Sequence, residues 1–165
     1  LQVLIKYLNN SINRIDSNYG KIVNKIIREN LEIIKTIPSK SDAYSLSGGY
    51  LLEIVDLLEL NKNLFGNYSD LDESIIVSGL ILKKIGLTRY FNNDIQLSVN
   101  DKLKNVDLRL ISLNIVNEYF FESKYEDVRF ILQNIILSPN DVNDINVRYI
   151  NALYDFNNNV KNVKI

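Results

Sequence analysis

The chain contains no cysteine, histidine, methionine or tryptophan among its 165 residues. Without cysteine there is no disulfide framework, no thiolate metal ligand and no cysteine nucleophile. Without histidine there is no imidazole ligand, no histidine base and no Ser-His-Asp triad. These absences exclude most of the usual catalytic repertoire. Because methionine is also absent, we expect that residue 1 is not the translation start and that the chain is a trimmed protein or part of a longer one.

The chain also lacks a strong charge of either sign. Its 19 basic and 20 acidic residues give a formal net charge of −1, which argues against a strongly electrostatic nucleic-acid binder. No apolar run reaches the ~18 residues of a membrane span, and no secretory signal opens the chain. With 46% hydrophobic residues, the composition is that of one globular domain, which we expect to be cytoplasmic. The enrichment in asparagine, isoleucine, lysine and tyrosine is typical of an AT-rich genome.

Helical periodicity dominates the sequence. Apolar residues recur every three or four positions, and two proline residues, Pro38 and Pro139, follow the ends of two such segments. Asp70 and Glu73 have the spacing of a capping box, and Gly86 is expected to stop the helix that follows them. We expect a loop or a short hairpin at 91–104 and a fraying tail at 157–165. The pattern predicts an all-α bundle of six to eight helices, with segments at about 1–15, 22–36, 49–64, 70–86, 105–121, 125–137 and 143–156.

Few residues in the chain suggest chemistry. A metal site would need carboxylates and amides alone, and the densest acidic cluster, at residues 70–73, lies at a predicted helix N-terminus where capping explains it. The Ser47-Gly48-Gly49 step lacks the Lys-Ser or Lys-Thr of a P-loop, so we interpret it as a loop-to-helix junction. Lys83 and Lys84 are the most unusual charges, because they interrupt an apolar helix.

Residues 78–86, Ser-Gly-Leu-Ile-Leu-Lys-Lys-Ile-Gly, resemble the Ala-Gly-x-x-Leu-His-Asp-Ile-Gly segment of HD-domain phosphohydrolases. Lys83 and Lys84 stand where that family has its His-Asp metal-binding dyad. Residues 48–53, Gly-Gly-Tyr-Leu-Leu-Glu, resemble the Gly-Gly-Leu-Leu-Glu-His segment of the YhaM-type 3′-to-5′ exoribonucleases, with Glu53 at the histidine position.

Two later segments extend the resemblance in the same order. Residues 133–140 resemble an Arg-His-x-Ile-Leu-Ser-His-His stretch, with Asn134, Pro139 and Asn140 at the histidine positions. Residues 154–157 resemble the Ala-Asp-Asn-Leu step, of which Asp155 alone is retained. The resemblance implies an HD-like core at 38–160, preceded by N-terminal helices at 1–37.

The same resemblance implies a dismantled metal site, with vestigial positions at Glu53, Lys83, Lys84, Asn134 and Asp155. Two ammonium groups in place of the dyad would repel a divalent cation, by about 4 kcal/mol per unit-charge contact at ~4 Å and an effective dielectric constant near 20. We therefore expect no metal and no cofactor. We expect instead that Lys83 or Lys84 neutralises Glu53 or Asp155 and cross-links the helices that the metal once joined.

These observations predict a catalytically inactive HD-like domain, a pseudoenzyme that acts as a protein-binding or structural subunit of a larger complex, such as a nucleic-acid-processing assembly. One alternative is an RNA- or nucleotide-binding module, in which Lys83, Lys84 and Arg89 contact phosphate and Tyr90 stacks on a base. Another is a viral Bcl-2-like interaction protein that holds a partner helix in a groove. An active phosphohydrolase with an all-oxygen site is the least favoured.

Overall fold

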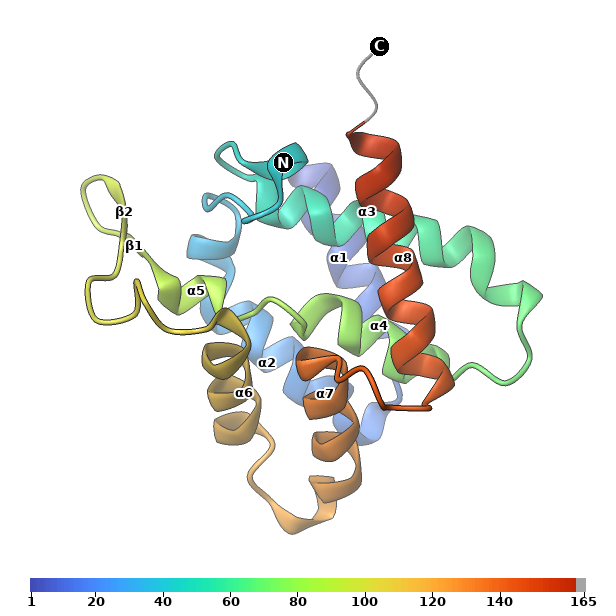
Figure 1. Ribbon diagram of the computed structural model, residues 1–165. Coiled ribbons are helices and arrows are strands. Elements are labelled where there is room, and N and C mark those ends of the chain that lie inside the picture. The colour runs from blue at the N-terminus through green and yellow to red at the C-terminus, as the bar shows by residue number, and fades with distance from the viewer. Residues whose placement is uncertain (163–165) are drawn as a thin grey trace.

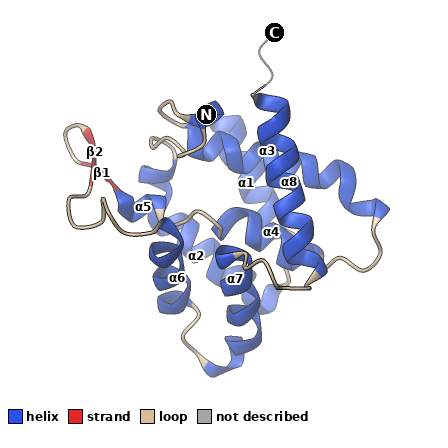
Figure 2. Cartoon of the chain, viewed as in Figure 1, coloured by secondary structure: helices blue, strands red, loops and turns tan. Residues whose placement is uncertain are grey.

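The computed structural model describes residues 1–162, and nearly all of its regular structure is helical (Figures 1 and 2). Seven helices of at least ten residues and one single-turn helix, α5, occur within this range, which confirms the all-α bundle. The α-helices are α1 (Gln2–Asn13), α2 (Ser17–Ile34), α3 (Gly49–Leu64), α4 (Glu73–Leu82), α5 (Leu87–Tyr90), α6 (Leu108–Tyr119), α7 (Glu126–Leu137) and α8 (Ile145–Lys161). Three 3₁₀ turns, η1 (Asp42–Tyr44), η2 (Phe65–Asn67) and η3 (Ser123–Tyr125), and two short strands, β1 (Phe91–Asn93) and β2 (Leu97–Val99), complete the described elements.

Aspartate begins four of the helices. The carboxylates of Asp16, Asp72, Asp107 and Asp144 each accept a hydrogen bond from a backbone N–H in the first turn that follows. The capping box predicted at Asp70 is wrong, since Asp72 caps α4. Helix α4 therefore begins at Glu73, directly after the extended residue Asp72.

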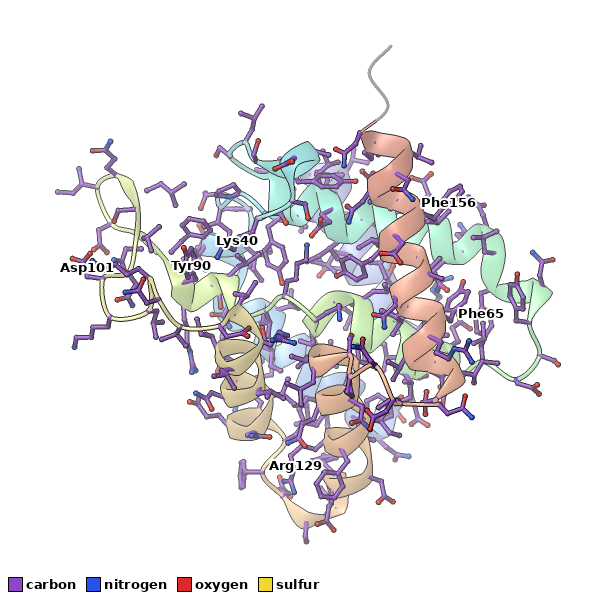
Figure 3. All side chains as sticks on the ribbon, in the orientation of Figure 1. Lys40, Phe65, Tyr90, Asp101, Arg129 and Phe156 are labelled. Atoms are coloured by element: carbon purple, nitrogen blue, oxygen red, sulfur yellow. The ribbon has the colours of Figure 1, made fainter. Side chains whose placement is uncertain are left out.

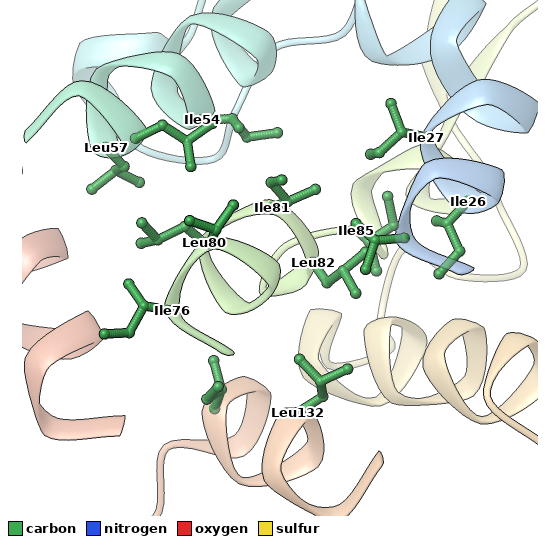
Figure 4. Close-up of a cluster of buried hydrophobic side chains, with 14 of the residues drawn as sticks. Ile26, Ile27, Ile54, Leu57, Ile76, Leu80, Ile81, Leu82, Ile85 and Leu132 are labelled. Atoms are coloured by element: carbon green, nitrogen blue, oxygen red, sulfur yellow. The ribbon is translucent and has the colours of Figure 1, made fainter. Parts of the chain in front are cut away.

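Helix α4 lies at the centre of the bundle and is buried on every side from Ile75 to Leu82 (Figure 4). Its neighbours are α1, α2, α3, α7 and α8. Gly79 permits the closest approach, because a Cβ there would lie 2.7 Å from Ile150 Cδ1 on α8 and 2.9 Å from Ile135 Cδ1 on α7. The almost all-round apolar pattern of this segment therefore reflects a helix enclosed by other helices.

The ends of α4 and α8 differ from the sequence prediction. Helix α4 ends at Leu82 instead of Gly86, because the chain turns there and the Gly86 N–H donates to Ser112 Oγ at 2.8 Å. Helix α8 continues to Lys161, since buried Asn157 donates from Nδ2 to the Tyr44 hydroxyl at 2.9 Å. Fraying at 157–161 was thus a wrong prediction, and residues 163–165 lie outside the described residues.

The remaining segments frame the bundle. Helices α6 and α7 pack against each other, and α3 packs against α8. The hairpin alternative at 91–104 is the one the chain adopts, with Phe91 paired to Val99 in an antiparallel ladder. This hairpin projects from the left edge of the bundle in Figure 1. None of the helices within residues 1–162 combines the length and the apolar character needed to cross a membrane.

Candidate functional site

Helix α3 and the end of α4 bring a carboxylate and an ammonium group together in the interior. Lys84 Nζ lies 2.8 Å from Glu53 Oε1, and the two side chains are 19% and 1% exposed. Ser39 Oγ donates to the same carboxylate oxygen at 2.9 Å, and Lys84 Nζ donates to Ser41 Oγ at 2.9 Å. We call these four residues the Lys84 cluster. It joins α3, α4 and the loop before α3 through one buried ion pair.

The second oxygen of Glu53 is not used by the protein. Glu53 Oε2 is buried and accepts no hydrogen bond from any residue that the structure describes. A buried carboxylate oxygen without a donor costs free energy, and Glu53 offsets that cost only through Oε1, which accepts from Lys84 and Ser39. The pair is therefore a tightly constrained part of the fold.

The ring of Tyr154 on α8 lies beside both lysines. Its centroid is 5.2 Å from Lys84 Nζ and 5.8 Å from Lys83 Nζ, within the range of cation–π attraction. Burial, and next the charge of Glu53, raises the pKa of the Tyr154 hydroxyl well above its ordinary value. Tyr154 therefore stays neutral and presents an aromatic face, not a second anion, to the lysines.

Lys83 has a different environment from Lys84. Its Nζ donates to the Ile135 carbonyl oxygen at 2.7 Å and to Ser138 Oγ at 2.6 Å, at the C-terminal end of α7. Ser138 has a left-handed backbone conformation with φ 45°, and its hydroxyl also lies 3.0 Å from Asn151 Oδ1. We call these four residues the Lys83 cluster. Lys83 thus caps the negative end of the α7 dipole.

No carboxylate within residues 1–162 forms an ion pair with Lys83. Burial, followed by repulsion from Lys84 and Arg109, lowers the pKa of the Lys83 ammonium to about 8. Lys83 is consequently a partly buried cation that helix carbonyl and hydroxyl oxygens stabilise, without a counter-ion.

Of the five positions predicted to be vestigial, the structure pairs only Glu53 and Lys84. Lys83 lies beside the same Tyr154 ring as Lys84 but contacts the end of α7, whereas Asn134 and Asp155 are exposed and take no part in either cluster. The expected lysine–carboxylate pair is therefore Lys84 with Glu53, and its alternative with Asp155 is wrong. Tyr154 faces inward, so the 100° rotation per residue of α8 turns the next residue toward solvent.

The sequence did not single out the polar residues Ser39, Ser41, Ser138 and Asn151 of the two clusters, or Tyr154, whose ring lies beside both lysines. The two serines of the loop belong to a polar stretch in which nothing distinguishes them from solvent-facing residues. Tyr154 could have been found from helical spacing, since it lies four positions after Ile150, an apolar residue of the predicted helix at 143–156 that the structure buries completely.

The residues expected to contact phosphate or RNA do not form one basic surface. The Arg89 guanidinium donates to the carboxylate of Glu118 on α6, with one of the two bonds at 3.0 Å. Lys40 Nζ lies over the ring of Tyr90, 4.3 Å from its centroid, and the two residues are adjacent in Figure 3. Since Lys83 and Lys84 point inward, the four predicted contacts separate into an interior pair and a peripheral pair.

The described residues offer no conventional metal centre. Within residues 1–162, no three histidine, cysteine, aspartate or glutamate residues gather where they could hold an ion. Glu53 supplies one carboxylate, and the ammonium group of Lys84 already binds it. The chemistry of the donor set therefore does not fit a divalent cation.

One face of α8 is apolar although solvent reaches it. Ile145, Phe156 and Val160 are 46%, 55% and 53% exposed, and Ala152 is exposed between them. Tyr149 continues the spacing and borders a hollow of about 540 Å³ at the start of α8, where it packs against Tyr68. We call these five residues of α8 the α8 face. Figure 3 shows Phe156 on the side of α8 where Phe65 also lies.

Comparisons with known proteins give no relative for this chain: no family model, no curated protein and no solved structure matches it significantly.

Proposed function

We propose that this chain is a non-catalytic, HD-like helical domain that acts by binding a protein partner within a larger assembly. The observation that carries this proposal is the buried ion pair between Lys84 and Glu53. Both residues stand at positions where the resemblance to HD-domain phosphohydrolases implies metal ligands. A salt bridge then joins α3 and α4 where a metal would join them in a catalytic relative.

The electrostatics of the Lys84 cluster support a non-catalytic domain. A divalent cation near Glu53 would have to displace an ammonium group from 2.8 Å and tolerate a second one on Lys83. Two like charges at ~4 Å repel by about 4 kcal/mol even at an effective dielectric constant near 20. The single carboxylate of Glu53 cannot offset that repulsion and also replace the hydration shell of the ion.

The α8 face supports a protein partner. Its apolar residues recur with helical spacing at 145, 149, 152, 156 and 160, which is the pattern of a helix that packs against another surface. A contiguous exposed apolar face rimmed by polar residues is typical of a protein interaction site. Asp155 and Arg148, both exposed, border this face on the polar side of α8.

Metal retention tests the non-catalytic part of the proposal. The purified domain is loaded with Mn²⁺, free ion is removed, and the retained metal is quantified by elemental analysis. We expect near-zero retention, and no hydrolysis of a phosphodiester substrate in the presence of Mn²⁺. Stoichiometric retention that Glu53→Gln abolishes would contradict the proposal.

Affinity capture with matched variants tests the binding part. Proteins from the source organism are captured with the wild-type chain and with Phe156→Ser/Val160→Ser. The control is Phe121→Ser/Phe130→Ser, at two other hydrophobic positions that are more than half exposed. We expect a partner that binds the wild type and the control but not the α8 variant, and that rebinds when purified. Identical captures by all three chains would exclude the α8 face as the interface.

A further inference from the structure

A hollow of about 400 Å³ lies between the start of α6 and the end of α7, next to the Lys83 cluster. Its two walls come from segments about 30 residues apart in sequence, and its volume is in the range of small-molecule sites. Ser138, which accepts a hydrogen bond from Lys83, forms part of the wall. The lining residues are Asp107, Arg109, Leu110, Leu137, Ser138, Pro139 and Asn140.

The two charged residues that line this hollow, Asp107 and Arg109, form an ion pair, and Lys83 adds a positive charge behind Ser138 of the wall. Lys84 is balanced by Glu53, and Arg109 is balanced by Asp107, to which its Nε and Nη2 donate. Lys83 has no ion-pair partner in the described chain, so its positive charge remains uncompensated. Lys83 is partly removed from water and has no carboxylate to replace that hydration. An anion in the neighbouring hollow would therefore lower the free energy of its ammonium group.

Donor groups are available on the hollow wall. The Nη1 group of Arg109 is not used in the bonds between Arg109 and Asp107, which leaves part of the guanidinium fork free to donate. Asn140 contributes an exposed amide to the same wall. Asp107 is the one acidic lining residue, and Arg109 holds the pKa of its carboxyl at about 2, so it stays paired at neutral pH.

We propose that this hollow binds the phosphate group of a small phosphorylated ligand. Arg109 and Asn140 donate hydrogen bonds to the phosphate, and the positive charge of Lys83, which lies behind Ser138, attracts it without direct contact. A guanidinium group matches the spacing of phosphate oxygens better than a single ammonium can. The volume leaves room for a substituent on the phosphate, such as a ribose. This site shares no residue with the α8 face, so it is independent of the proposed protein partner.

Titration with three probes tests the proposal: inorganic phosphate, adenosine 5′-monophosphate and adenosine. Binding is followed by the backbone and side-chain ¹H–¹⁵N shifts of the whole chain, at fixed ionic strength. We expect both phosphates to bind with a Kd of about 1 mM or tighter, and to shift the signals of Arg109, Ser138 and Asn140. Adenosine should shift none of these signals.

Matched variants assign the site. Arg109→Gln, at an exposed position, should weaken phosphate binding about tenfold, which is the value of one charge-assisted hydrogen bond. Lys83→Met should weaken it by a similar factor, with folding verified by circular dichroism. Arg28→Gln removes the same charge from the exposed surface of α2 and should leave the Kd unchanged.

The two phosphates distinguish the source of the ligand. Tighter binding of the nucleotide than of inorganic phosphate would identify a nucleotide site, and equal binding would identify a site for the phosphate group alone. No shift of these signals with either phosphate would overturn the proposal. Equal weakening by Arg28→Gln would overturn it as well, since binding would then follow net charge and not this hollow.

Discussion

Lys83 and Lys84 are adjacent in the sequence, yet they occupy two chemically different regions of the molecule. The Lys84 cluster contains a formal counter-ion, Glu53, and closes the contact between α3 and α4. The Lys83 cluster contains only neutral oxygen atoms and closes the contact between α4 and α7. The comparison shows that a buried ammonium can be accommodated either by a carboxylate or by the carbonyl end of a helix, with different consequences for stability.

Helix geometry explains why the two neighbours separate. Helix α4 ends at Leu82, and each residue in the following turn projects in a direction different from the one before it. Lys84 therefore reaches α3, whereas Lys83 reaches α7 on another side of the core. One double-lysine step thus connects three helices, and Tyr154 on α8 contacts both ammonium groups.

The largest expected effect comes from removing the cation of the Lys84 cluster. Lys84→Met leaves the carboxylate of Glu53 buried without a counter-charge and should lower the free energy of unfolding by about 3–5 kcal/mol. Urea denaturation followed by circular dichroism measures this change. The double variant Lys84→Met/Glu53→Leu should recover most of the loss. A loss below about 1 kcal/mol in the single variant would show that the buried pair contributes little.

The second effect is a pH dependence of the free energy of unfolding that arises from Lys83. The pKa of Lys83 is lowered from 10.5 to about 8 in the folded chain, so between these values the unfolded chain binds more protons. The free energy of unfolding should therefore rise with pH between about 8 and 10, by about 2 kcal/mol after allowance for partial exposure. The buried tyrosines begin to oppose this rise near pH 10, where the unfolded chain starts to release their protons, because burial raises the pKa of Tyr19 to about 12 in the folded chain.

Denaturation curves at several pH values below 10 measure this rise. Lys83→Met should make the profile flat over the same range, whereas the matched control Lys62→Met, at an exposed position on α3, should retain the slope. A profile that rises equally in Lys83→Met would assign the titration to another group.

The third effect concerns the hydroxyl groups that serve the two lysines. Ser138→Ala removes one of the two acceptors of Lys83 and should cost about 1 kcal/mol. Ser41→Ala removes an acceptor from Lys84, which retains its carboxylate, and should cost about half as much. Thermal unfolding of both variants under identical conditions gives the comparison. The opposite order would indicate that the carboxylate does not compensate Lys84.

The smallest effect is expected at the exposed ion pair of Arg89 with Glu118. Both side chains are substantially open to water, at 40% and 57% exposure, so Glu118→Gln should change the free energy of unfolding by less than about 0.5 kcal/mol. Any loss should diminish at high salt, unlike that of Lys84→Met. Chemical denaturation at low and high ionic strength measures both. A salt-independent loss above about 1 kcal/mol would contradict this ranking.

The helices could be predicted from the sequence because their cores repeat with helical spacing, as in the segment 49–64, which matches α3 from Gly49 to Leu64. The residues at which the helices end were less predictable, because contacts with distant parts of the chain determine some of these ends. Asn157 extends α8 because its amide reaches Tyr44, a contact between residues 113 positions apart. No local pattern carries that information.

The candidate site, like the helices, could be predicted only where the local sequence carries the information. The apolar surroundings of Lys83 and Lys84 indicated two unusual cations, and the resemblance pointed to Glu53 as a partner. The local sequence could not show that Asn134 and Asp155 turn outward, because each lies next to an inward-facing residue whose place is set by packing. The serines that complete both clusters likewise depend on the path of a loop and on a left-handed residue at the end of α7.

The β1–β2 hairpin has a consequence for cleavage of the backbone. Ile95 at its tip is fully exposed, and the hairpin divides the chain into a segment with α1–α5 and a segment with α6–α8. A protease that cuts at this tip would meet little packed structure, which is where nicking concentrates. The two fragments would nevertheless remain associated, because α4 packs against α7 and α8, and α3 against α8, across the cut. The domain therefore provides a natural position for a split protein whose halves reassemble through the core.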